Sequence, residues 1–166
     1  DAELAKKFAT QAVNHSIGVM TAKDDAAQMS QGAGMTFRNN IEWLAGNYNE
    51  ARMGSSIFSY LMGYEDPRLN VYFLPMDGNA SYGVEAFNGK TYQAVPAGHA
   101  NAQNDIYKSC SKPNSQSGTP TYWLRASEVY FLRAEAALVW EGFGSADSWY
   151  KQGIDMSFQE NGVTEP

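Results

Sequence analysis

The chain has 166 residues, a length that suits a single domain, and its balance of 43% hydrophobic and only 18% charged residues excludes a disordered chain and a coiled coil. The formal net charge of -6 at pH 7 leaves no excess of Lys and Arg to neutralise phosphates, so we expect no nucleic-acid partner. These residues contain neither a signal segment nor the roughly 18 apolar residues of a membrane span. The lone Cys110 permits no internal disulfide.

The N-terminal segment predicts one helix followed by irregular chain. Asp1 is placed to cap this helix, whose apolar face ends near Asn14 or His15. Residues 18–21 indicate a short extended piece, and residues 24–34, rich in Ala, Gln and Gly, indicate a loop or a brief helical turn.

A second helix is predicted to begin at Ser55 and to end at Gly63. Asp66 and Pro67 follow and form a turn, because the residue before a proline avoids the helical conformation. The short apolar run at residues 69–74 then predicts a strand.

Residues 76–121 differ in kind from the rest of the chain. They are rich in Asn, Gln, Gly, Pro and Ser, carry scattered aromatic rings and show no sustained period. A loop this long inside a compact domain is uncommon and is usually functional or disordered. We expect an ordered surface excursion of polar and aromatic residues, with a small β-hairpin at residues 84–95 that turns at Asn88 and Gly89.

Residues 124–162 predict a helical hairpin. In the first helix, residues 124–140, apolar side chains recur every three to five residues as one buried stripe, and Arg125 and Glu128 are spaced to pair along its side. Two glycines then end this helix, and Ser145 caps a second one that reaches Gly162. Two helices joined by so short a turn pack antiparallel, like one tetratricopeptide repeat.

The predicted fold class is mainly α, with a tetratricopeptide-like helical hairpin, long irregular loops and a small β-hairpin, all within a single domain at residues 1–166. No second copy of the hairpin appears at a fixed period. The core of the hairpin is expected to contain the three tryptophans on or beside it, Trp123, Trp140 and Trp149.

Two motifs carry a resemblance to a known family. The first is RASEV at residues 125–129, followed by AEA at 134–136, a glycine-bearing turn, Trp149-Tyr150, Gly153-Ile154 and Ser157; the second is YEDPRL at residues 64–69. Together with residues 18–29, these motifs resemble the C-terminal part of SusD/RagB-like proteins, which are outer-membrane glycan-binding lipoproteins.

The resemblance has several implications. Such a protein captures oligosaccharides at the bacterial cell surface and delivers them to a TonB-dependent transporter of the SusC type, without a cofactor. The chain would be a fragment of a longer protein whose signal peptide, lipid-bearing cysteine and N-terminal helices lie outside these residues. Truncation also leaves apolar surface through which the fragment is expected to self-associate.

Sugar recognition needs flat aromatic faces for the apolar side of the sugar ring and amide or carboxylate groups for its hydroxyls. Two sets of residues in loops supply both chemical types. They are Trp43 with Asn40, Asn47 and Tyr48, and Tyr82 with Asn79 and Asn88. The competing interpretation of Trp43 is an amphipathic ring that anchors a loop to the core. The sugar-contacting residues of SusD-like proteins lie in variable loops, so the resemblance assigns no position here.

Other chemistries find less support. Asp77, Asn79 and Ser81 imitate the first ligands of a calcium loop, but the turning Gly and the closing Glu of that motif are missing, so we expect no metal site. No spacing predicts that His99 approaches Cys110 as a base would approach a nucleophile. We therefore expect no catalytic residue.

The leading prediction is non-catalytic glycan binding by stacking and hydrogen bonding on preformed loops. Two alternatives stay open. A helical scaffold that binds only protein would be indicated by buried loop aromatics. A glycan-active enzyme would be indicated by paired carboxylates in a cleft, one of them with a raised pKa.

Overall fold

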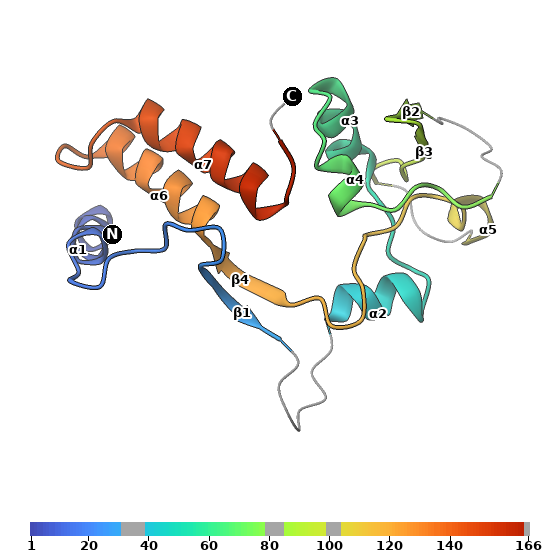
Figure 1. Cartoon of the computed structure of the whole chain (residues 1–166), viewed down its shortest axis with the longest axis horizontal. Helices are drawn as coiled ribbons and strands as arrows, with labels where there is room; N and C mark the ends of the chain where they lie inside the picture. Colours follow the sequence, from blue (N-terminus) through green and yellow to red (C-terminus); the bar gives the residue numbers. More distant parts are fainter. Residues whose placement is uncertain (31–38, 79–84, 99–103, 165–166) are drawn as a thin grey trace. The chain divides into compact units, whose positions relative to one another are not determined.

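The computed structural model describes residues 1–30, 39–78, 85–98 and 104–164. It divides into two compact units: unit 1 consists of Asp1–Met29 and Tyr122–Thr164, and unit 2 contains the chain between them, Ser30–Thr121. Helices prevail over strands, as Figure 1 shows, and the predicted mainly α fold class is confirmed.

Unit 1 begins with α1 (Ala2–Val13), the predicted helix, and the Asp1 carboxylate caps it by accepting a hydrogen bond from the Leu4 amide at 3.2 Å. A strand, β1 (Ala26–Met29), then pairs with β4 (Thr121–Arg125). Both strands correct the sequence predictions, which assigned residues 24–34 to loop or helical turn and began the long helix at 124. Because β4 reads TYWLR, its β-branched and aromatic residues suit a pleated sheet and outweigh the helical spacing of Leu124.

The predicted helical hairpin is confirmed as α6 (Ala126–Val139) and α7 (Ala146–Glu160), which lie side by side in Figure 1. In the turn between them, Gly142 and Gly144 have φ values of 92° and 89°, a left-handed conformation that glycine adopts without strain. Ser145 caps α7 as predicted, since its side chain accepts a hydrogen bond from the Ser148 amide at 3.3 Å.

A carboxylate at the end of α7 ties the two helices together. The side chain of Glu160 is 1% exposed and accepts hydrogen bonds from the Ser127 amide at 2.9 Å and the Ser127 hydroxyl at 2.6 Å. Arg125 donates from Nη2 to the Glu160 carbonyl at 3.0 Å, and its Nε lies 3.3 Å from the carboxylate. The predicted side-chain pair of Arg125 and Glu128 is therefore wrong. Because Arg125 ends a strand, its side chain reaches Glu160 instead, while Glu128 accepts from the Arg125 amide at 3.0 Å.

The stripe predicted to be buried on α6 is buried only in part. Ala134 and Ala136 are buried, whereas Leu132 and Val139 are 56% and 61% exposed. Trp123, expected in the core, is 70% exposed on β4, while the other two tryptophans beside the hairpin are half-buried. A periodic pattern shows which face of a helix is apolar, but it does not show which part of that face another element covers.

Unit 2 contains α2 (Asn40–Gly46), the predicted helix α3 (Ser55–Gly63) and the short helix α4 (Leu69–Tyr72). The strand predicted for residues 69–74 is wrong. The Asp66 carboxylate accepts a hydrogen bond from the Arg68 amide at 2.9 Å, and the Asp66 carbonyl accepts one from the Leu69 amide at 3.1 Å. These bonds start a helical turn, and a short apolar run cannot by itself distinguish a buried strand from a buried helix.

The predicted β-hairpin is confirmed. β2 (Glu85–Phe87) pairs antiparallel with β3 (Lys90–Tyr92), and Phe87 lies opposite Lys90. Asn88 and Gly89 form the turn with φ values of 47° and 73°, as the tight turn of a two-residue hairpin requires.

The stretch at residues 76–121 supplies core as well as surface. Besides the hairpin it contains α5 (Asn104–Tyr107) and the fully buried side chains of Tyr92, Gln93 and Ser111. Ser111 joins two other segments, because its amide donates to the Gln93 carbonyl at 2.9 Å and its carbonyl accepts from the Met53 amide at 2.8 Å. The hydrophobic core of unit 2 packs around these segments and comprises Met53, Phe58, Leu61, Leu69, Phe87, Tyr92 and Ala94.

Candidate functional site

The segment that carries Trp43 is a short helix, not the loop that its asparagines predict. The Asn39 side chain caps α2 by accepting a hydrogen bond from the Ile41 amide at 2.9 Å. Asn at the cap and Glu42 three residues later form a known helix-start pattern. The sequence therefore contains the signal for this helix, although the asparagines around the rings also favour a turn.

α2 turns one face inward and another outward. Ala45 is buried, while Asn40, Trp43 and Asn47 follow one another at steps of three and four residues and so share the opposite face. Asn40 and Asn47 are exposed, Trp43 is half-buried, and Tyr48, just after the helix, is 53% exposed. We call Asn40, Trp43, Asn47 and Tyr48 the α2 platform.

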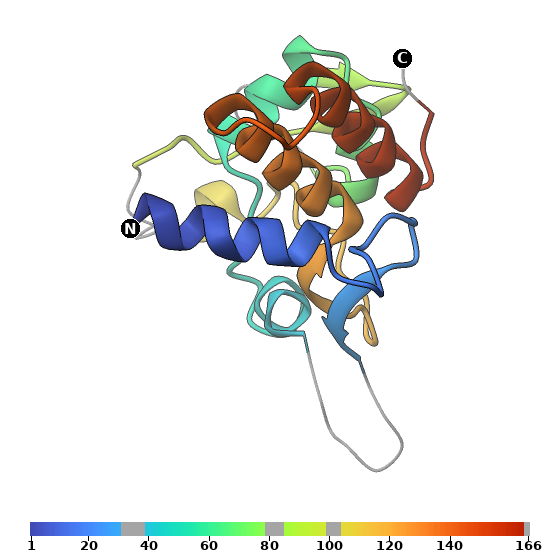
Figure 2. The same ribbon diagram turned by 90° about the vertical axis from the view of Figure 1, so that its left-hand side faces the viewer.

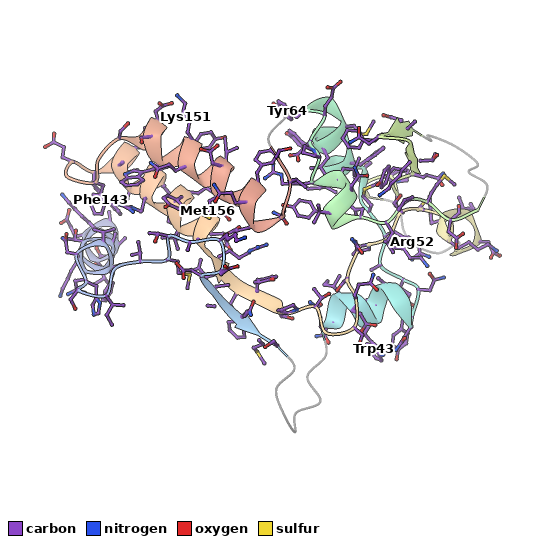
Figure 3. The ribbon with its side chains drawn as sticks, viewed as in Figure 1. Trp43, Arg52, Tyr64, Phe143, Lys151 and Met156 are labelled. Carbon is purple, nitrogen blue, oxygen red and sulfur yellow. The ribbon has the colours of Figure 1, made fainter. Side chains whose placement is uncertain are left out.

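The two rings of the α2 platform lie edge to face. The centroids of Trp43 and Tyr48 are 4.1 Å apart, and their planes meet at 85°. Aromatic pairs favour an edge-to-face arrangement, so each ring supports the other without a ligand. Asn40 and Asn47 add side-chain amides, each able to donate and to accept hydrogen bonds. The structure thus brings together four of the seven predicted site residues, and Figure 3 shows Trp43 on α2.

Of the other three predicted site residues, the structure describes Asn88 alone. Asn79 and Tyr82 lie outside the described residues, as do Ser81 and His99. Asn88 is exposed in the turn between β2 and β3. Its positive φ is one that asparagine tolerates better than most residues, so the turn explains why asparagine stands there. Within unit 2, Figure 1 shows this hairpin apart from α2.

Sequence reasoning missed two side chains that hold the segment around α2. Asn39 donates a hydrogen bond to the Pro120 carbonyl at 3.1 Å, and Arg52 donates to the Tyr107 carbonyl at 3.0 Å. Desolvation in its half-buried position lowers the pKa of Arg52, whose hydrogen bonds run to neutral carbonyl and amide oxygens. No spacing in the sequence predicts contacts between residues this far apart in the chain.

A cavity of about 780 Å³ lies in unit 1 and contains none of the predicted site residues. It runs between α1 and α6, which cross in Figure 2. Its lining is almost entirely apolar, with Ala5, Ala9 and Ala12 on one side and Leu132 and Val139 on the other. Sugar hydroxyls need hydrogen-bond partners, and apart from Arg133 and Glu135 the side chains of these walls are almost all apolar, so this groove suits a glycan poorly.

The charged groups of the described residues do not indicate catalysis. Within the described ranges, the carboxyl groups with shifted pKa values are Asp25 and Asp66, and both values are lowered. Hydrogen bonds from the Thr21 and Ala22 amides lower the pKa of Asp25. Burial alone raises the pKa of Asp66, but the hydrogen bonds and charge of Arg68 outweigh burial and lower it. A glycosidase acid needs a raised pKa instead.

Neither a metal centre nor a membrane-spanning helix is found among the described residues. In the part of the chain that the structure describes, no three or more His, Cys, Asp and Glu gather as metal ligands would. Within the same ranges, no helix combines the length and the apolar character that crossing a membrane requires.

Comparison with known proteins places these features in a family. A family model described as "Susd and RagB outer membrane lipoprotein" matches residues 1–165. This family consists of non-catalytic binding lipoproteins. No curated protein sequence matches the chain.

Several solved structures share the fold. A SusD-like protein from Bacteroides thetaiotaomicron is 32% identical with a TM-score of 0.80. A SusD homolog from Bacteroides vulgatus is 33% identical with a TM-score of 0.79, and a chitin-binding SusD homolog from Flavobacterium johnsoniae is 30% identical with a TM-score of 0.82. Each match covers 99% of this chain but only 32% of the other, so the chain spans about a third of the length of these relatives. With its family model matched from residue 1 to residue 165, the chain belongs to the SusD-like family.

Proposed function

We propose that this chain binds glycan at the α2 platform and breaks no bond. The observation that carries the proposal is the outward face of α2, where a half-buried Trp43 and an exposed Tyr48 stand beside the exposed Asn40 and Asn47. The rings offer apolar faces to a sugar, and the amides offer partners to its hydroxyls. We also propose that Asn79, Tyr82 and Asn88 contact the glycan.

The proposal extends to the whole protein. As a member of a family of outer membrane lipoproteins, the full-length protein would display this site at the cell surface and pass captured oligosaccharide to a SusC-like TonB-dependent transporter. Chitin is the first glycan to test, because the Flavobacterium johnsoniae homolog, 30% identical to this chain, is a chitin-binding protein.

The two alternative functions fit the described residues less well. A protein-only scaffold predicts buried loop rings. Phe87, Tyr92 and Tyr107 are buried as that alternative expects, whereas Tyr48 at the α2 platform is 53% exposed. A glycan-active enzyme predicts a carboxyl group with a raised pKa, whereas the shifted carboxyls of the described residues, Asp25 and Asp66, are both lowered.

Native gels cast with glycol chitin, starch or xylan test the proposal. Trp43→Ala removes the larger ring of the α2 platform, and Trp123→Ala is the matched control because it removes an exposed tryptophan from β4 in unit 1. We expect one glycan to retard the wild type and Trp123→Ala equally, and to bind Trp43→Ala about tenfold more weakly, a loss of about 1.4 kcal/mol. Retardation of Trp43→Ala equal to that of the wild type would move the site elsewhere, and no retardation by any glycan would contradict binding by this chain.

A further inference from the structure

α2 is too short to hold its own position. It has seven residues, and isolated helices shorter than about 12 residues are marginal in water. Ala45 is the residue of this helix that is buried, and a methyl group anchors a helix weakly. Trp43 is half-buried and adds to this anchor, but we expect the ties at the two ends of so short a helix to contribute to the orientation of the α2 platform.

The tie at the N-terminal end is Asn39. Its Oδ1 accepts a hydrogen bond from the Ile41 amide at 2.9 Å, and its Nδ2 donates one to the Pro120 carbonyl at 3.1 Å. One side chain thus caps the helix and fixes it to a segment 81 positions later. Asp caps a helix as well as Asn does, but it has no amide to donate.

The tie at the C-terminal end is Arg52. After α2 the chain reverses at Asn49, which has a φ of 58°, and Arg52 donates from Nη2 to the Asn49 side chain at 2.9 Å. Its Nε and Nη2 also donate to the carbonyls of Tyr107 and Lys108 at 3.0 and 3.2 Å, while Nη1 donates to its neighbour Ala51 at 2.9 Å. Figure 3 shows Arg52 on the segment that follows α2. Lysine cannot reproduce this planar set of donors.

From these contacts we infer that Asn39 and Arg52 are positioning residues that hold the α2 platform in its binding geometry. Neither residue belongs to the platform, and each acts by tying one end of α2 to backbone carbonyls far along the chain. The inference rests on the proposed function for its effect on glycan affinity. It also predicts an effect on the backbone of α2 that needs no glycan.

The test compares Asn39→Asp and Arg52→Lys with a matched control. Asn114 accepts from Gln116 Nε2 at 3.2 Å and donates from Nδ2 to the Val71 carbonyl at 3.0 Å, so Asn114→Asp removes an equivalent amide donor elsewhere in unit 2. Amide hydrogen exchange at residues 39–48 is measured by mass spectrometry in each variant. We expect exchange about tenfold faster in Asn39→Asp and Arg52→Lys, as loss of about 1.4 kcal/mol of local stability predicts, and unchanged in Asn114→Asp.

Glycan affinity of the same variants supplies the second measurement. We expect Asn39→Asp and Arg52→Lys to weaken binding while the melting temperature stays close to that of Asn114→Asp, and Asn39→Asp to cause no further loss once Trp43→Ala is present. Unchanged exchange at α2, or unchanged affinity in both variants, would overturn the inference while leaving the proposed function intact. If the wild type binds no glycan, the proposed function fails, and the exchange rates alone decide whether the two residues hold α2.

Discussion

Asp66 and Arg68 show how a motif that marks a family is built from local chemistry. Their side chains are 11% and 22% exposed, and the Arg68 Nε donates to both carboxylate oxygens of Asp66 at 2.9 and 3.1 Å. The same carboxylate accepts the Arg68 amide and so shapes the turn that starts α4. Pro67 between them fits this turn because the residue before a proline avoids the helical conformation. The motif thus has a structural role in unit 2.

The lowered pKa of Asp66 predicts a pH-dependent stability. A carboxyl group whose folded pKa lies below its unfolded value, about 3.9, stabilises the fold above that value, and this contribution is lost as the pH falls through the folded pKa. We expect Asp66→Asn to lower the free energy of unfolding by about 1–3 kcal/mol at pH 7, and the gap to wild type to shrink below about pH 4. Urea unfolding at several pH values measures both effects.

A gap between wild type and Asp66→Asn that stays constant from pH 7 to pH 3 would contradict this account. Asp25→Asn is a useful comparison, because Asp25 also has a lowered pKa but accepts its hydrogen bonds from the Thr21 and Ala22 amides rather than from an arginine.

At the scale of elements, α6 and α7 approach closely where a glycine faces a ring. A Cβ built on Gly153 would lie 2.7 Å from Cε1 of Phe131, closer than real side chains come. The Phe131 ring also packs against the Tyr150 ring, and their centroids lie 5.6 Å apart. The glycine in the family motif therefore serves the packing of the hairpin.

Gly153→Ala is expected to destabilise the chain even though alanine favours a helix. Forcing a methyl group into this contact costs about 1–3 kcal/mol, which exceeds the gain of about 1 kcal/mol in helix propensity. Gly63→Ala is the control, since Gly63 ends α3 and a Cβ added there would meet nothing within 4 Å, so this change is expected to be neutral or slightly stabilising. A melting temperature of Gly153→Ala that equals or exceeds that of Gly63→Ala would contradict this prediction, because it would show that the Phe131 ring moves aside without a loss of stability.

The elements that the sequence predicts well are those with local signals. Asp1 and Ser145 cap their helices, and Asn88 with Gly89 turns the hairpin, so these follow from a few neighbouring residues. β4 and α4 are short apolar runs that fit a strand or a helix equally well. The pairing with β1 decides β4, and the turn that Asp66 starts decides α4.

The candidate site can likewise be predicted from the sequence only where its signals are local. The rings and amides around Trp43 are visible in the sequence as the two chemical types that a sugar needs. Their placement on one face of a helix requires the cap at Asn39, a signal that the surrounding asparagines obscure. The ties to Pro120 and Tyr107 depend on chain topology and could not be predicted.

At the scale of the whole molecule, the two units carry different surfaces. Unit 2 presents the polar and aromatic α2 platform, while unit 1 contains the apolar groove between α1 and α6. The chain spans about a third of the length of the solved relatives that it matches. The expected self-association stays a prediction, and the exposed Leu132 and Val139 at the groove are its structural reason.

The measurement that tests the central claim most directly is a glycan titration followed through the indole N–H signals of the four tryptophans in ¹⁵N-labelled chain. The ligand is a chito-oligosaccharide or an oligosaccharide of the glycan that retards the chain in gels, and Trp43→Ala assigns the signal of Trp43. Binding at the α2 platform predicts a saturable shift of the Trp43 signal, with the signal of Trp149, whose Nε1 donates to the Phe143 carbonyl at 2.8 Å, unchanged. A saturable shift at another tryptophan while Trp43 stays still would contradict the account.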